Sequence, residues 1–175
     1  MASIQEVSPS DDFFSVYAKY TQGQESPQAF HFWTAVGILS GICGRNILLD
    51  RGYYTLYPNH YIVLSSGSAL CRKSTALGIG VRILKDALGR LRGEDGTIIT
   101  GLPTILSSKM TPEALCRALS RKGIDSLDGT FDENALEGVS RPVVLYSSEL
   151  GVFMSKASQA SGLVDLLIDF YDCPD

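Results

Sequence analysis

One stretch of the chain decides the fold prediction: Tyr61-Ile-Val-Leu-Ser-Ser-Gly67-Ser-Ala-Leu-Cys-Arg72-Lys73-Ser74-Thr75. It starts with a compact apolar run over residues 61–64, which is typical of a buried parallel strand. A Ser/Gly loop follows, and apolar residues then recur at helical spacing from about Lys73 to Leu91. The phosphate-binding P-loop has the same order: a strand, a glycine, four residues, then glycine, lysine and serine or threonine opening a helix. Gly67, Lys73 and Ser74 fit that pattern, and Arg72 stands where the second glycine is expected.

The residue types of this loop match the chemistry of phosphate binding. Backbone N–H groups at the start of a helix hold phosphate oxygens, and the partial positive charge of the helix terminus strengthens that attraction. A lysine reaches the β- and γ-phosphates, and the hydroxyl beside it binds Mg²⁺. The residues predicted to bind ATP are Gly67, Ser68, Ala69, Leu70, Cys71, Arg72, Lys73, Ser74 and Thr75, with Ser74 also on the metal. The alternative is a Ser/Gly turn that only connects a strand to a helix.

The second half of such a site is an acidic residue at the end of another buried strand. Glu149 follows the apolar run Val143-Val-Leu-Tyr146 in this way, with Ser148 where many P-loop enzymes have an aspartate. An acid there orients Mg²⁺ through water or activates the attacking water as a general base. We therefore predict Lys73 and Glu149 as catalytic residues and Glu149 as a second metal residue; the alternative is an ordinary strand-end glutamate.

The rest of the sequence predicts helices and one hairpin around this centre. The first helix spans residues 11–20, with Asp11 or Asp12 as its cap. The second is capped by Ser26, has Pro27 in its first turn and ends at Gly44. Because the second helix is apolar nearly all round, we expect it to be buried. A hairpin is predicted over residues 47–57, with its turn at Asp50-Arg51-Gly52. A loop or weak strand is predicted over 93–101, and further helices over 111–123 and 162–171. The division is an N-terminal helical segment (1–45) and a partial P-loop NTPase core (46–175).

Composition excludes several classes of protein. A hydrophobic fraction of 45% with 19% charged residues supplies a core and excludes disorder, collagen and coiled coil. A net charge of −4 without a basic run argues against a dedicated duplex-binding module. The longest apolar stretch, residues 33–43, is too short for a membrane span, and the N-terminus lacks the pattern of a signal peptide. Four dispersed cysteines and two histidines show no metal-ligand spacing, so we expect reduced thiols in a soluble, intracellular protein.

The sequence from about Phe13 onward also resembles a known family, the P-loop helicase-like proteins of phages, prophages and other mobile elements. They are usually described only as a domain of unknown function and often accompany or are fused to primases. The resemblance is to the N-terminal part of these proteins. It is carried by Tyr20-Thr-Gln-Gly23, Pro27, Phe30-His31-Phe32-Trp33, Gly44-Arg45, Leu49-Asp-Arg-Gly52, Leu56-Tyr-Pro-Asn59, Arg72-Lys73-Ser74-Thr75, Thr111-Pro112-Glu113-Ala-Leu115, Ser148-Glu149-Leu150-Gly151 and Asp169-Phe-Tyr-Asp-Cys-Pro174.

The resemblance implies a RecA-like ATPase core, an α/β fold with a parallel sheet flanked by helices, that drives movement on DNA during replication of a mobile element. It implies that Lys73 and Ser74 bind phosphate and Mg²⁺ and that Glu149 is the catalytic acid. The implied partners are single-stranded DNA, a primase and further copies of the full-length chain, in the cytoplasm of a bacterium or a phage-infected cell. Members of the family continue past the position of Asp175, through further core strands and an arginine that acts on a neighbouring subunit's nucleotide. The chain as given is therefore expected to bind ATP but to hydrolyse it slowly or not at all.

Two alternative functions remain open at this point. A small P-loop kinase would need an arginine-rich lid after Glu149, and none is evident in the sequence. A non-catalytic remnant of such an ATPase would fold and bind a partner, with or without nucleotide.

Overall fold

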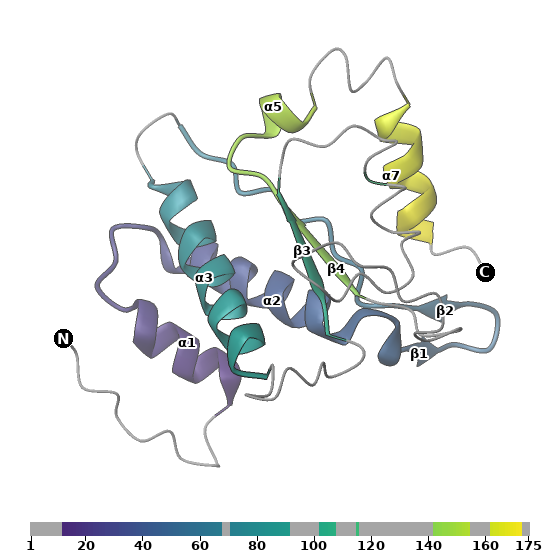
Figure 1. Cartoon of the computed structure of the whole chain (residues 1–175), viewed down its shortest axis with the longest axis horizontal. Helices are drawn as coiled ribbons and strands as arrows, with labels where there is room; N and C mark the ends of the chain where they lie inside the picture. Colours follow the sequence, from purple (N-terminus) through teal and green to yellow (C-terminus); the bar gives the residue numbers. More distant parts are fainter. Residues whose placement is uncertain are drawn as a thin grey trace, which may run out of the picture.

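A computed structural model of the chain describes residues 12–67, 71–91, 102–107, 115, 142–154 and 162–172. The fold is mixed α/β, with an antiparallel hairpin and a two-stranded parallel sheet among helices (Figure 1). In chain order the elements are α1 (Phe13–Thr21), α2 (Gln28–Cys43), the 3-10 helix η1 (Gly44–Asn46), β1 (Leu49–Asp50), β2 (Thr55–Leu56), α3 (Lys73–Leu91), β3 (Thr104–Ser107), β4 (Val143–Tyr146), α5 (Leu150–Phe153) and α7 (Leu163–Asp172).

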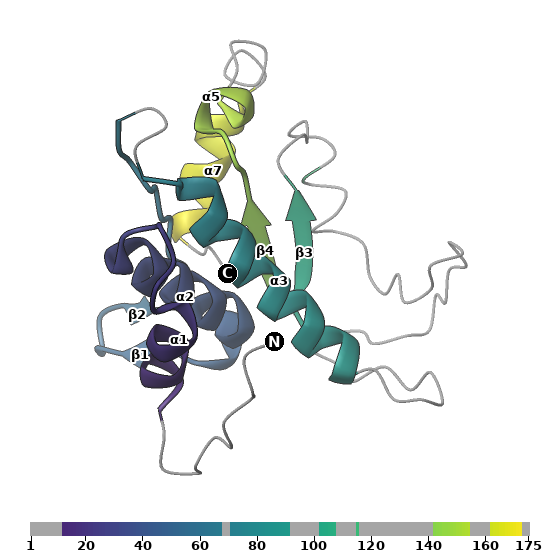
Figure 2. The same cartoon turned by 90° about the vertical axis from the view of Figure 1, so that its left-hand side faces the viewer.

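Helix α2 is the element on which the others pack. Helices α1 and α3 both contact it, and β4 lies against its C-terminal half (Figure 2). The buried core residues at these contacts are Tyr17, Ala35, Ile38 and Leu84, with Ile105 and Val144 of the sheet packed against them. The N-terminal helices and the sheet therefore share one hydrophobic core.

Helix α1 begins as the sequence predicts. The Asp12 carboxylate accepts hydrogen bonds from the N–H groups of Phe14 (2.9 Å) and Ser15 (3.1 Å), which otherwise have no partner in the first helical turn. The Ser15 hydroxyl also donates to Asp12, and these bonds hold the pKa of that carboxyl below its usual value.

Helix α2 differs from its prediction in two respects. Its N-cap is Pro27 rather than Ser26, whose hydroxyl instead donates to the carbonyl of Arg72, 46 residues away. The helix is also buried on one side only, because Phe32 and Trp33 remain 49% and 48% exposed. The expectation of an all-round buried helix was wrong because the described elements cover only the face with His31, Ala35 and Ile38.

The predicted hairpin is confirmed. Strands β1 and β2 pair antiparallel, with Leu49 opposite Leu56 and Asp50 opposite Thr55. In the turn, Gly52 has a φ of +80°, which glycine adopts without strain, and its N–H donates to the Asp50 carboxylate.

The strand predicted at residues 61–64 is wrong. These residues join no sheet in the described structure, and Tyr61 and Val63 are more than half exposed. Burial alternates from residue to residue, with Ile62 and Leu64 half-buried, as in an extended chain that packs on one face. The Tyr61 hydroxyl donates to the carbonyl of Leu167 in α7, and Ile62 lies against Gly37 of α2. Contacts with two helices therefore hold this segment without a strand ladder.

The parallel sheet consists of β3 and β4, paired in register from Thr104 opposite Val143 to Ser107 opposite Tyr146. The prediction of a strand at β4 is confirmed, although its side chains are half-buried rather than buried. Strand β3 was not predicted, because only two apolar residues, Ile105 and Leu106, mark it in the sequence. The predicted helices at α3 and α7 are confirmed, and the predictions over residues 93–101 and 111–123 lie outside the described residues apart from helical Leu115. No described helix is long and apolar enough to cross a membrane.

Three buried side chains of α1 and α2 place polar atoms in the core. The hydroxyls of Tyr17 and Thr34 and both ring nitrogens of His31 have no hydrogen-bond partner in the described part of the chain. Burial, with a contribution from Tyr20, raises the pKa of Tyr17 to about 12. Burial likewise lowers the pKa of His31, which is 1% exposed.

The packing of α3 on α2 predicts opposite effects for two glycine substitutions on the same helix. A Cβ at Gly80 would lie 2.3 Å from Thr34 Cγ2 and 2.9 Å from Ile38 Cδ1, so Gly80→Ala should destabilise the protein by about 1–3 kcal/mol. The matched control is Gly78→Ala, which meets nothing within 4 Å and should stabilise the helix by about 0.5–1 kcal/mol. Urea unfolding measures both, and equal effects would contradict the described helix contact.

Buried His31 predicts a loss of stability in acid. Its pKa in the folded protein lies below the unfolded value of about 6.5, so from about pH 6.5 downward the unfolded chain binds a proton that the folded chain does not. The free energy of unfolding should fall as the pH is lowered, until the pKa of His31 in the folded protein is passed. Above about pH 7, His31 should contribute nothing to the pH dependence of that free energy. His31→Leu should reduce the difference in stability between about pH 7 and about pH 5. The same difference in both proteins would mean that His31 is not buried in neutral form.

Candidate phosphate-binding site

The start of α3 presents free backbone donors. The carbonyl of Arg72 accepts from the N–H groups of Thr75 (3.0 Å) and Ala76 (3.3 Å) and so closes the first helical turn. The N–H groups of Lys73 and Ser74 precede these bonds, and no described acceptor pairs with them. Donors in this position, reinforced by the helix dipole, attract an anion.

The backbone of Arg72, directly before these donors, has an unusual conformation. Its φ is +43°, and among the described residues it is the only non-glycine with a positive φ. A residue in the left-handed region directly before a helical one turns successive N–H groups toward a common point, which forms an anion-binding nest. Arg72 therefore adopts the φ for which the expected glycine would be suited, at the cost of a Cβ in a disfavoured region.

The Lys73 side chain is bonded to Ser66. Its ammonium donates to the carbonyl (2.9 Å) and the hydroxyl (3.1 Å) of Ser66, at the end of the extended segment. The lysine charge thus lies where the loop leaves that segment and where α3 begins. Gly67 is exposed and Cys71 is a half-buried free thiol, whereas Ser68, Ala69 and Leu70 lie outside the described residues.

The loop between α1 and α2 holds Arg72 from the other side. The Ser26 hydroxyl donates to the Arg72 carbonyl at 2.8 Å, and the Glu25 carboxylate lies 2.7 Å from Nε of the Arg72 side chain. Both side chains of this ion pair are largely exposed, so the arginine points toward solvent and Glu25. The sequence did not predict the contacts of Glu25 and Ser26 with Arg72, because contacts between segments this far apart along the chain leave no local pattern.

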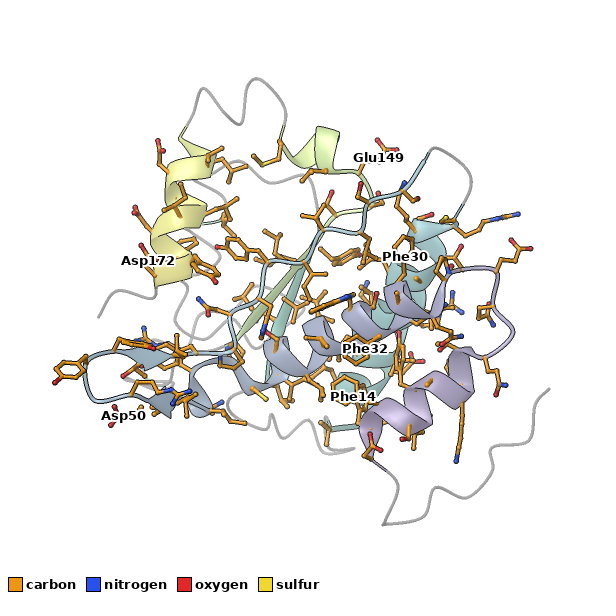
Figure 3. All side chains as sticks on the ribbon, turned by 180° about the vertical axis from the view of Figure 1, so that it is seen from behind. Phe14, Phe30, Phe32, Asp50, Glu149 and Asp172 are labelled. Carbon is orange, nitrogen blue, oxygen red and sulfur yellow. The ribbon has the colours of Figure 1, made fainter. Side chains whose placement is uncertain are left out.

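The predicted metal residues lie at the same end of the molecule. Ser74 and Thr75 are exposed residues on the first turn of α3. The carboxyl ends of β3 and β4 point toward the end at which α3 begins (Figures 1 and 2), and Glu149, which follows β4, lies there (Figure 3). Glu149 is the N-cap of α5, and its exposed carboxylate makes no hydrogen bond or ion pair with the described residues.

The residues present fit Mg²⁺ only together with a phosphate. No group of three or more His, Cys, Asp or Glu in the described residues is arranged to hold a metal ion. Mg²⁺ commonly takes one or two protein ligands and completes its octahedron with phosphate oxygens and water. The Ser74 hydroxyl and the Glu149 carboxylate are suitable for that partial role.

Comparison of the chain with protein-family models, with curated proteins and with solved structures found no match.

The positive φ of Arg72 predicts that glycine is the more stable residue at this position. Arg72→Gly removes the Cβ and the Glu25 ion pair, whereas Arg72→Ala removes the ion pair but keeps the Cβ. The glycine variant should therefore be more stable than the alanine variant by about 1 kcal/mol. Thermal or urea unfolding gives the comparison. An alanine variant at least as stable as the glycine variant would show that position 72 is not left-handed.

Proposed function

We propose that the chain is an ATP-binding P-loop NTPase that holds the phosphates of Mg·ATP at the start of α3. The observation that carries the proposal is the left-handed Arg72 directly before Lys73 and Ser74, which gathers backbone donors, an ammonium and a hydroxyl at one helix terminus. A disfavoured φ costs free energy and persists only where the surrounding structure holds it, and such residues cluster at functional sites. A Ser/Gly turn that only connects two elements would not require such a residue.

Each residue has a distinct task in this proposal. The N–H groups of Lys73 and Ser74 hold phosphate oxygens, and the Lys73 ammonium leaves Ser66 for the β- and γ-phosphates. The Ser74 hydroxyl binds Mg²⁺, which offsets charge on the phosphates. Glu149 orients Mg²⁺ through water or accepts a proton from the attacking water. Glu149 lies at the end of the molecule at which α3 begins, and this placement supports the role (Figure 3).

The finer proposal is a RecA-like core of a helicase-type motor that acts in DNA replication of a phage or mobile element. The parallel pair β3 and β4, with Glu149 after β4 and α3 packed beside it, supports this proposal. Single-stranded DNA, a primase and further copies of the chain are the partners that this proposal implies.

The test is titration calorimetry with Mg·ATP on the wild type and on Lys73→Ala. Loss of the ammonium should weaken binding by about tenfold or more, because a charged hydrogen-bond donor contributes about 1.5–3 kcal/mol. The matched control is Lys85→Ala, which removes the same charge from the same helix about 18 Å further along. Equal affinity of Lys73→Ala and the wild type would overturn the proposed phosphate site.

A phosphate-release assay on the same proteins tests the catalytic part. Any turnover should be slow unless a cation offsets the charge that develops on the transferred phosphoryl group. An arginine finger supplies such a cation in related enzymes and contributes about 10³–10⁵ in rate. Glu149→Gln should keep the affinity for Mg·ATP and abolish the turnover. Fast, DNA-stimulated turnover that Glu149→Gln removes would establish a complete motor and contradict the expected slow hydrolysis.

A second candidate function, partner binding without catalysis, is supported by exposed apolar side chains. The hairpin exposes about half or more of Leu48, Leu49, Tyr53 and Tyr54, and two isolated strands are only marginally stable in water. A folded wild type that does not bind Mg·ATP would favour this candidate. A small kinase gains no support from the described residues.

A further inference from the structure

We infer that Ser26 is a positioning residue for the phosphate site: its hydroxyl fixes the peptide plane between Arg72 and Lys73 and so aims the Lys73 N–H at the bound phosphate. The inference deepens the proposed function and rests on it. It concerns a residue on the loop between α1 and α2, far in sequence from the P-loop-like segment.

The Arg72 carbonyl accepts three hydrogen bonds. Two come from the helix, from Thr75 N–H and Ala76 N–H, and the third comes from the Ser26 hydroxyl at 2.8 Å. The bonds from α3 hold the carbonyl along the helix, and the bond from Ser26 ties it to a separate element. The direction of the carbonyl is therefore fixed by α3 and by the loop before α2 together.

The direction of this carbonyl determines the direction of the next N–H. The described peptide bonds are all trans, and in a planar trans peptide the C=O and N–H groups point in opposite directions. Fixing the Arg72 carbonyl thus fixes the Lys73 N–H, which points out of the start of α3 toward the anion position. A donor held in place before the ligand arrives loses less entropy on binding.

Ser26 is itself held firmly. It is 3% exposed and precedes Pro27, whose ring restricts the conformation of the residue before it. The amide of Gln28 donates to the carbonyl of Thr21, the last residue of α1, and joins the two ends of the loop. The Ser26 hydroxyl therefore belongs to a rigid connection between α1 and α2.

Glu25 also contacts Arg72, but through the side chain of the arginine rather than through its backbone. Its ion pair with Arg72 is exposed on both sides, and exposed pairs contribute little because water and salt screen them. We therefore expect Ser26, through the backbone, to matter more for the site than Glu25, through the side chain.

The experiment compares Ser26→Ala with Ser40→Ala. Ser40 is the matched control, because its hydroxyl also donates to a distant, partly buried carbonyl, that of Pro58. Each variant should lower the melting temperature by about 2–4 °C. Only Ser26→Ala should weaken the binding of Mg·ATP, by about three- to tenfold, the equivalent of one hydrogen bond. Without nucleotide, only Ser26→Ala should speed hydrogen exchange at the N–H groups of Thr75 and Ala76.

The outcomes separate this inference from the proposed function. A wild type that does not bind Mg·ATP overturns the proposed function and the inference with it. Binding by the wild type with equal affinity in Ser26→Ala overturns the inference alone. Equal weakening in Ser26→Ala and Ser40→Ala also overturns it, because the effect would then follow global stability. Unchanged exchange at Thr75 and Ala76 in Ser26→Ala overturns the positioning argument.

Discussion

The close approach of α3 to α2 is the contact on which the rest of the structure depends. Gly80 permits this close approach, because any side chain there would occupy the space of Thr34 Cγ2 and Ile38 Cδ1. Gly41 does the same for β4, since its absent Cβ leaves room for Val144. Helix α2 is thus contacted closely by another helix and by the sheet, at positions where a larger residue would push these elements apart.

This packing also determines where the candidate site lies. Gly80 is two helical turns from Lys73, so the contact with α2 fixes the direction in which α3 presents its first turn. The same contact brings the start of α3 beside the loop before α2, where Ser26 reaches the Arg72 carbonyl. The donors of the site are therefore organised by core packing on one side and by a single hydrogen bond on the other.

The elements that the sequence predicted correctly are those that local information determines. The apolar periodicity of α3 and α7, the Asp12 cap of α1 and the turn at Gly52 all act within a few residues. The strand predicted at 61–64 failed because a strand also needs a neighbour, and apolar composition does not say whether helices or strands will cover it. The prediction that Ser26 caps the second helix was wrong for a related reason. A serine that caps a helix and a serine that bonds to a distant carbonyl can have the same local sequence. For the candidate site, the sequence located the lysine, the hydroxyl and the start of the helix, but not the residues that hold Arg72.

At position 72 the local rules and the structure disagree, because Arg72 is a non-glycine residue with a positive φ. A glycine would adopt the positive φ without strain, and the arginine holds it at a cost of about 1 kcal/mol. That cost is tolerated because the Ser26 bond, the first turn of α3 and the Glu25 pair all fix the same residue. A glycine would also leave the unfolded loop with more freedom to lose on folding. The strain is therefore held at a residue that contacts on both sides fix at the start of α3. Backbone donors that are fixed before a ligand arrives lose less entropy on binding.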